Sequence, residues 1–287
     1  MKIKQIPEDF VVEEVLDLKI EEGPYFYYKV CKKSWNTLDV VREVKKRLKV
    51  RDVGYAGLKD RNAVTTQYIS VKKKINFNLK DVSFDYLGKG KQRIYKGMLE
   101  GNKFTITVRD LDKKLGEIKE VVNLFGEQRF GKNNALLGKY LVQKKFKEVC
   151  EELSLEVQRN DYVGALKKHG VDKLKIYVAA YQSELWNKLA KKSKKKFIPI
   201  LGFVTEGNDY EKIMEEEEIV KKDFIIRPIP EIAAEGSERD RIVEVSDFKI
   251  LSFEDDDLNI GKKKQVVEFY LQKGAYATVL LESLLNR

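Results

Sequence analysis

The sequence of 287 residues contains one histidine and two cysteines. A zinc site needs more of these residue types than are present, so zinc chemistry is not expected. Cys31 and Cys150 are far apart and form no CxxC pair, which argues against a disulfide framework and for a reducing compartment. His169 follows two lysines and precedes Gly170, a pattern typical of a cationic helix end with a glycine cap rather than of a catalytic triad.

Long apolar runs are also missing. No stretch approaches the ~18 apolar residues of a membrane span, and residues 1–5 show no apolar signal segment. We therefore expect a soluble, cytoplasmic protein without membrane association. Charge, in contrast, is abundant: 56 Lys and Arg against 46 Asp and Glu give a formal net charge of +10. That excess favours a polyanionic partner, nucleic acid above all.

The spacing of apolar residues and turn signals predicts α+β structure in the first third of the chain, and the length allows one large domain or two modest ones. Strands are expected over 10–20, 25–31, 68–71, 93–98, 104–108 and 265–271, with 93–98 and 104–108 forming a pair. Helices are expected over 36–48, 115–124, 140–153 and 178–190, and from Ala277 onward.

The helix expected over 36–48 has an apolar and a basic side. Its apolar residues at helical spacing are Leu38, Val41, Val44 and Leu48, and its basic residues are Arg42, Lys45, Lys46 and Arg47. A basic helix face is either a solvated surface or a phosphate-contacting one, and the sequence leaves both open. The lysine-rich run 191–196 presents the same alternatives.

A glycine-punctuated polar segment, 54–67, contains Asp60 between Lys59 and Arg61 and leads into a strand. Positive neighbours favour the ionised form of a carboxylate, and an ionised carboxylate on a rigid turn can act as a nucleophile. The alternative is a solvated turn with an ordinary surface ion pair, and composition alone does not exclude it.

Residues 126–133 approach the phosphate-loop pattern GxxxxGK[ST], but Asn133 lacks the hydroxyl that ligates magnesium. A nucleotide hydrolase is therefore disfavoured. Phe125 and Phe130 lie beside amide and cationic side chains, and such a set suits an extruded base, which needs a stacking face and hydrogen-bonding groups. The alternative is that both phenylalanines belong to the core.

Five segments, in order along the chain, resemble motifs of the TruD family of tRNA pseudouridine synthases. They are PEDFVVEE (7–14), AGLKDRNAVT (56–65), NLFGEQRFG (123–131), AYQSELWN (180–187) and KGAYAT (273–278). Five ordered motifs are far more specific than any single one, and together they span nearly the whole chain. The region 191–247 matches poorly and is short for the family's inserted domain.

The resemblance implies a pseudouridine-synthase core of α+β class, with a mixed, largely antiparallel sheet, flanking helices and a family-specific inserted α/β domain. It assigns 1–152 and 246–287 to the core and 153–245 to the insertion, and it leaves open whether helix 178–190 packs with the core. The implied reaction converts uridine to pseudouridine in tRNA, at position 13, without a cofactor. The implied partner is tRNA, and no protein partner is implied.

The resemblance also implies roles for six residues. Asp60 aligns with the catalytic aspartate and Lys4 with a basic active-site residue. Phe125 aligns with the aromatic residue that stacks on the target base. The residues that align with the lining of the uridine pocket are Phe10, Asn123 and Tyr276; the last is a phenylalanine in some relatives, and the ring is retained.

The implied reaction needs an ionised carboxylate, so a buried Asp60 needs a cationic partner. Neighbours in an extended chain point to opposite sides, which makes Lys4 an easier partner than Lys59. The sequence leaves open whether the carboxylate attacks the sugar or the base, or supports a glycal route. A non-catalytic RNA-binding protein is the alternative function, since it would keep the basic surface and aromatics without needing Asp60.

Overall fold

The computed structural model describes residues 1–285 and divides the chain into two compact units. The first unit takes Met1–Glu120, Glu244–Ala277 and the chain from Leu281; the second takes Val121–Val243 and Thr278–Leu280. The strands are β1 (Phe10–Val15), β2 (Tyr25–Lys33), β3 (Gly54–Tyr55), β4 (Val64–Val71), β5 (Val82–Gly90), β6 (Gly101–Leu111), β7 (Glu120–Val122), β8 (Phe197–Ile200), β9 (Ser237–Asp240), β10 (Ile242–Glu244), β11 (Ser246–Asp255) and β12 (Lys263–Gln272). The helices are α1 (Thr37–Leu48), α2 (Asn134–Val142), α3 (Phe146–Glu152), α4 (Tyr162–Lys192), α5 (Glu211–Glu216) and α6 (Ala277–Leu285), with short 3₁₀ turns η1 (Pro7–Asp9), η2 (Glu127–Arg129), η3 (Lys221–Phe224) and η4 (Pro230–Ile232).

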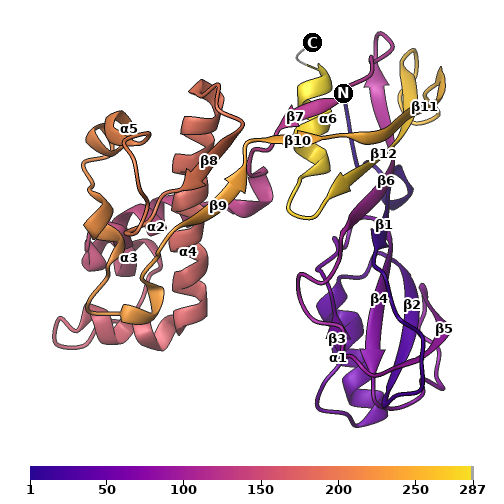
Figure 1. The fold of residues 1–287 in the computed structure, drawn as a ribbon, viewed down its shortest axis with the longest axis horizontal. Helices are drawn as coiled ribbons and strands as arrows, with labels where there is room; N and C mark the ends of the chain where they lie inside the picture. The colour runs from indigo at the N-terminus through magenta and orange to yellow at the C-terminus, as the bar shows by residue number, and fades with distance from the viewer. Residues whose placement is uncertain (286–287) are drawn as a thin grey trace. The chain divides into compact units, whose positions relative to one another are not determined.

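The first unit is built on an eight-stranded sheet (Figure 1). Its strand order is β11-β12-β6-β1-β4-β2-β5, and β3 pairs with β4. The central pair β1 and β4 is parallel, with Val11 opposite Val64, whereas their neighbours β6 and β2 run antiparallel to them. The segments that precede β1 and β4 therefore meet at one edge of the sheet, together with the last residues of β2.

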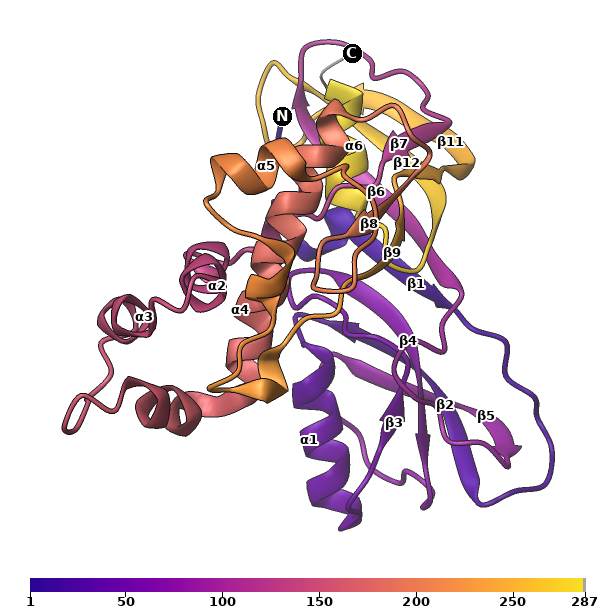
Figure 2. The ribbon, with the colours of Figure 1, turned by 60° about the vertical axis from the view of Figure 1, so that its left-hand side comes forward.

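Helix α1 covers one face of this sheet (Figure 2). It begins where the sequence predicts, because the Asn36 side chain accepts a hydrogen bond from the Asp39 amide at 2.8 Å. Val40, Val41, Val44 and Leu48 are buried in the same core cluster as residues of β2 and β4. Leu38, which was expected on the apolar side, is instead 48% exposed, so the buried face is turned by part of a helical turn from the predicted one.

The second unit contains helices α2, α3 and α5, the two-stranded sheet of β8 and β9, and the long helix α4. The helix expected over 140–153 is divided into α2 and α3, because Lys144 between them has a left-handed φ of 58°. The helix expected over 178–190 lies inside α4, which is broken at Gly170, where φ is 123°. Glycine is suited to that conformation because it carries no Cβ.

Two expected elements are wrong. Residues 93–98 form a loop rather than a strand, and β6 pairs with β1 and β12 instead. Residues 115–119 form neither helix nor strand, and β7 follows them. Here the Gln265 side chain accepts the hydrogen bond of the Leu115 amide, and the Lys119 carbonyl accepts from the Val245 amide. The Lys119 carbonyl, which would have accepted a hydrogen bond within a helix, is thereby bonded to a distant partner.

The α+β class with a mixed, largely antiparallel sheet agrees with the sequence prediction. The two compact units divide between residues 120 and 121, whereas the sequence analysis placed the start of the inserted domain at 153. The boundary at 153 follows the family pattern and not the compactness of the chain, so it stays a prediction. None of the helices within residues 1–285 combines the length and the apolarity needed to cross a bilayer.

Candidate active site

Asp60 lies in the loop before β4, and Lys4 lies in the segment before β1. Because β1 and β4 are parallel neighbours, these two loops are adjacent at the same sheet edge. Lys4 Nζ is 2.5 Å from Asp60 Oδ2, with side-chain exposures of 15% and 40% respectively. The structure thus shows the ion pair that the sequence argument favoured, and it leaves the carboxylate accessible enough to meet a substrate.

Lys4 is held in an unusual backbone conformation. Its φ is 57°, a left-handed value that costs energy for a residue with a side chain. The Asn62 side-chain amide, from the same loop as Asp60, donates to the Lys4 carbonyl at 3.0 Å. The Lys4 ammonium also lies 4.0 Å from the centre of the Phe10 ring. Phe10 is only 4% exposed and packs edge-on against Phe104, so the Lys4 side chain rests on a ring that is itself fixed in the core.

The segment that carries Lys4 is fixed on both sides by Arg109 of β6. The backbone of Lys2 exchanges two hydrogen bonds with that of Arg109, at 2.8 and 2.9 Å, and the Arg109 guanidinium donates to Asp9 Oδ1 at 2.8 Å. The guanidinium also donates to Asp256. Burial acts to raise the pKa of the Asp256 carboxyl, but hydrogen bonds from two backbone amides, Asn259 and Arg109 hold that pKa well below its usual range.

Lys59 points away from Asp60, as expected for adjacent residues of an extended loop. Its ammonium lies 2.9 Å from Glu14 Oε2 and donates to Asn102 Oδ1 at 2.6 Å. Glu14 and Asn102 face each other across β1 and β6. The Lys59 and Glu14 side chains are 5% and 0% exposed, so this is a buried ion pair that anchors the Asp60 loop to β1. This role was not predictable from the sequence, because the alternation of charged residues along β1 does not show which acid will be buried.

The backbone of the Asp60 loop is tied to the start of α1. The Thr37 hydroxyl accepts from the Lys59 amide at 2.8 Å and donates to Gln67 Oε1 at 2.7 Å. Thr37 is 1% exposed. A hydroxyl that can both accept and donate suits this place, because it satisfies a loop amide and a strand side chain together.

Two of the six predicted residues, Asn123 and Phe125, lie in the second unit. Phe125 meets the Trp186 ring edge-on, with 5.6 Å between centroids. The Arg239 guanidinium lies 4.0 Å from the centre of the Phe125 ring and donates to Asn123 Oδ1 at 2.8 Å. Asn187 accepts from the Phe125 amide and donates to its carbonyl, at 2.8 and 2.9 Å. We call Asn123, Phe125, Trp186 and Arg239 the aromatic–arginine cluster.

The aromatic–arginine cluster changes what can be expected of Phe125. The residue is 9% exposed, and a guanidinium lies over its ring. Arginine stacks readily on flat rings, so it occupies the kind of position that a base would take. A base that stacks here must therefore use the remaining ring surface or take the place of Arg239. No local pattern pointed to Arg239, because it lies 114 positions from Phe125 along the chain.

The six predicted residues fall into three places. Lys4, Phe10 and Asp60 are in mutual contact through Lys4 in the first unit, and Asn123 and Phe125 share the aromatic–arginine cluster in the second. Tyr276 lies in the short segment between β12 and α6, partly buried. Among residues 1–285, no group of three or more His, Cys, Asp or Glu side chains is placed to hold a metal ion.

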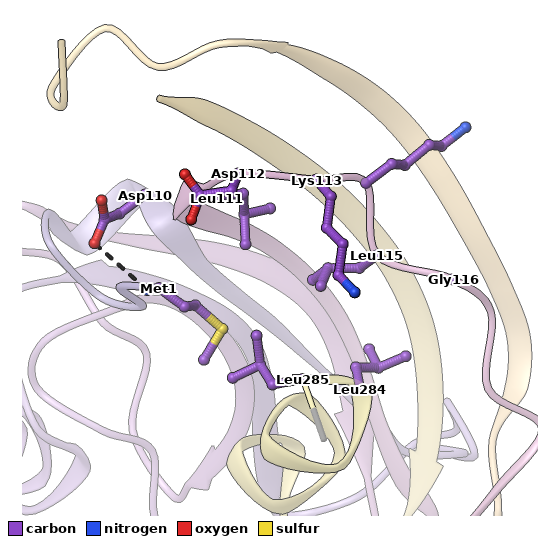
Figure 3. Close-up of a pocket in the computed structure, with 10 residues that line it drawn as sticks. Met1, Asp110, Leu111, Asp112, Lys113, Leu115, Gly116, Leu284 and Leu285 are labelled. Atoms are coloured by element: carbon purple, nitrogen blue, oxygen red, sulfur yellow. Dashed lines mark hydrogen bonds and ion pairs between the residues drawn. The ribbon is translucent and has the colours of Figure 1, made fainter. Parts of the chain in front are cut away.

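A surface pocket of about 340 Å³ adjoins Asp60. Its lining comes from the start of α1 and the Asp60 loop, and it includes the guanidinium side chains of Arg42 and Arg61 and the exposed Leu58. A larger pocket of about 490 Å³ lies elsewhere in the first unit and includes none of the six predicted residues (Figure 3). There Met1, Leu115, Leu284 and Leu285 form an apolar part of the wall, and Asp110, Asp112 and Lys113 line its rim.

The site in the first unit therefore combines a partly exposed carboxylate, one ammonium partner and an adjoining pocket, all on loops that buried side chains hold. Such a carboxylate can attack an electrophilic carbon or stabilise positive charge that develops on a sugar.

Comparison with known proteins agrees with the family that the sequence motifs indicated. The family model for tRNA pseudouridine synthase D (TruD) matches residues 1–156 and 203–284. A protein of Methanocaldococcus jannaschii named "Probable tRNA pseudouridine synthase D 2" is 30% identical, over 98% of this chain and 91% of that protein. A second relative, from Methanococcus maripaludis and named "Probable tRNA pseudouridine synthase D 1", is 26% identical over the full length of both chains. A crystal structure from Methanosarcina mazei, of a protein described as a candidate TruD, shares the fold with a TM-score of 0.79, over 99% of this chain and 93% of that one, at 23% identity.

The chain belongs to the TruD family of tRNA pseudouridine synthases, and it is an enzyme of the isomerase class. The family model leaves 157–202 unmatched and covers 203–247, so the poorly matching region begins and ends earlier than the sequence analysis expected. The alignment with the M. jannaschii relative runs over 384 residues, more than the 287 of this chain, so that relative has residues without a counterpart here.

Proposed function

We propose that this protein isomerises uridine to pseudouridine in tRNA, at position 13, with Asp60 as the nucleophile. Family membership supports the reaction class. The observation that carries the role of Asp60 is its ion pair with Lys4, 2.5 Å long, on a loop beside a pocket. An ammonium partner favours the ionised carboxylate, which is the form that a nucleophile requires.

The reaction needs no co-reactant, because its atoms balance within the substrate. The bond between N1 of uracil and C1′ of ribose breaks, the base turns, and a bond forms between C5 and C1′. The proton on C5 leaves and N1 gains one. Asp60 stabilises the detached fragments, either by attack on C1′ or on the base or by supporting a glycal, while Lys4 holds its carboxylate in place.

The uracil must remain bound while it is detached from its ribose. We assign this task to the rings and amides that the family pattern places around the base: Phe10, Asn123, Phe125 and Tyr276. Aromatic faces hold a flat base by stacking, and amide groups read its hydrogen-bonding edge. The buried position of Phe10 makes it a support for Lys4 first, and a wall for the base only through its edge.

Extruding the uridine from its helix costs a few kcal/mol, which contacts to the tRNA backbone have to supply. Two basic surfaces could make them. On α1, Arg42 and Arg47 are already paired with Asp39 and Glu43, at 3.0 and 3.3 Å. In the run 191–196 every lysine is exposed, and Lys195 is paired with Asp209 at 2.5 Å. We favour the lysine run, because all five of its lysines are exposed, whereas Lys45 on α1 is partly buried.

The test is to incubate the purified protein with an unmodified tRNA transcript and to map pseudouridine chemically along it. We expect one modified position, 13, with wild type and none with Asp60→Asn. Asp85→Asn is a matched control, because Asp85 is an exposed carboxylate on β5 of the same unit. Absence of pseudouridine with the folded wild type would overturn the proposed reaction. Modification at another position would overturn only the assignment to position 13.

A protein that only binds RNA predicts a different pattern. It would bind the transcript without modifying it, so any effect of Asp60→Ala would be seen in the affinity for RNA alone. Measuring affinity and modification on the same samples separates the two functions.

A further inference from the structure

Lys32 is a buried lysine that has no role in the reaction proposed above. It lies near the end of β2, opposite Thr65 of β4, and it is 1% exposed. Its ammonium donates to the Asp60 carbonyl oxygen at 3.1 Å, lies 3.5 Å from that of Lys59, and donates to the carbonyl of Trp35. Two of these three acceptors belong to the loop that carries the proposed nucleophile.

Stability alone does not account for an ammonium at this place. Taking a charge out of water is costly, and an apolar side chain of similar length often serves the fold as well or better. Methionine would fill the same space without that cost. Methionine could not donate hydrogen bonds, however, whereas the Lys32 ammonium donates to three carbonyl groups and holds them around one point.

We propose that Lys32 is a positioning residue for Asp60. By holding the carbonyls of residues 59 and 60, it fixes the peptide from which the Asp60 side chain reaches Lys4. This inference rests on the proposed function, since it assumes that the Asp60 carboxylate is the reacting group. Lys59 acts on the same loop through its side chain, which is anchored by Glu14 and Asn102, and Lys32 acts on its backbone. The loop is thereby fixed by two buried ammonium groups.

The charges around Lys32 give this arrangement a pH dependence. Burial lowers the pKa of the Lys32 ammonium to about 8, although the negative charge of Asp60 acts to raise it. The positive charge of Lys59 lowers that pKa further, and Cys31 on the same strand acts to raise it. The ammonium form is therefore present below about pH 8 and is lost as pH rises through that value. A charge-assisted hydrogen bond is stronger than a neutral one, so the loop is held best on the acid side.

The test compares Lys32→Met with Lys29→Met, a control on the same strand at a partly exposed lysine. Single-turnover rates are measured at saturating tRNA across about pH 6 to 9, together with tRNA affinity and thermal unfolding. We expect Lys32→Met to lose about 10²-fold in rate near pH 7, the size of loss that small misplacements of reacting groups cause. Its affinity for tRNA and its melting temperature should stay close to those of wild type.

The pH profile gives a second, independent readout. Wild type and Lys29→Met should lose rate as pH rises through about 8, and Lys32→Met should lack that decline. Hydrogen exchange of the amides in 57–63 should be faster in Lys32→Met than in wild type, and exchange elsewhere in β2 and β4 should be unchanged. Should Lys32→Met fail to fold, the wild-type profile still decides: a rate that stays level through pH 8 to 9 overturns the proposal.

Three other outcomes would also overturn it: a normal rate in Lys32→Met, a decline with pH that is the same in both variants, or a loss of rate matched by an equal loss of folded protein. Each differs from failure of the proposed function, in which the folded wild type itself forms no pseudouridine.

Discussion

The two clusters that carry the predicted residues are held by different forces. In the first unit, the Asp60 loop is fixed by buried charges, with Lys59 paired to Glu14 inside the protein. In the second unit, Phe125 is fixed by ring contacts with Trp186 and by two hydrogen bonds that its backbone exchanges with the Asn187 side chain. Ammonium and carboxylate groups make the main contacts around Asp60, and rings, amides and a guanidinium make those around Phe125.

This difference matches the two tasks of a base-isomerising enzyme. A nucleophile must be held in one place and in one charge state, and buried ionic contacts achieve that at a cost in desolvation. A base-binding surface must accept a flat ring and release it, and the Phe125 ring with the Arg239 guanidinium over it is built from flat groups that stack. The proposed roles of Asp60 and of Phe125 thus call for the two kinds of surroundings that these residues have in their own units.

The largest effect should come from breaking the buried pair in the first unit. Lys59→Met leaves Glu14 charged and buried, and removal of one partner from a buried ion pair costs about 3–5 kcal/mol of unfolding free energy. The double variant Glu14→Met, Lys59→Met removes both charges and should recover much of that loss. Chemical denaturation of the two variants measures this. Additive losses in the double variant would contradict the account of the pair.

A smaller effect is expected in the aromatic–arginine cluster. Phe125→Ala removes a stacking surface worth about 1–3 kcal/mol per base, so turnover should fall by about one to two orders of magnitude. Phe125→Tyr keeps the ring and should be much milder. Melting and single-turnover rate are measured on the same preparations. A large loss of melting temperature with normal turnover would show that Phe125 is only a core residue.

The smallest effect concerns the basic surface that binds the tRNA backbone. Affinity for tRNA should fall steeply with salt, because phosphate neutralisation releases counterions. Replacing Lys194 and Lys196 with glutamine should reduce the slope of log affinity against log salt by about one to two units, without moving the modified position. The same change at Lys46 and Arg47 of α1 is the matched comparison. An unchanged slope in the first variant and a reduced one in the second would move the backbone contact to α1.

Local features were predictable from the sequence where a short range of residues decides them. The Asn36 cap is such a case, and so is the opposite direction of Lys59 and Asp60. Elements that depend on distant partners were not: residues 115–119 form no helix, and Gln265 and Val245, far along the chain, bond to their backbone instead.

The site shows the same division. The family resemblance pointed to Lys4 and Asp60 as site residues. The parallel pairing of β1 and β4 brings these two residues together, and no local sequence pattern reveals that pairing. Glu14 and Arg239 were missed because their roles arise from contacts with residues 45 and 114 positions away. A buried acid and an arginine on a ring become visible only once the strands are placed.

The single-turnover rate of Asp60→Asn at saturating tRNA tests the central claim most directly. Asparagine is isosteric with aspartate but cannot act as an anionic nucleophile, so we expect a loss of more than ~10³-fold, with folding and tRNA affinity nearly intact. Asp85→Asn, measured in parallel, should keep the wild-type rate. A rate for Asp60→Asn within tenfold of wild type would contradict the assignment of the chemical step to Asp60 and to the first unit.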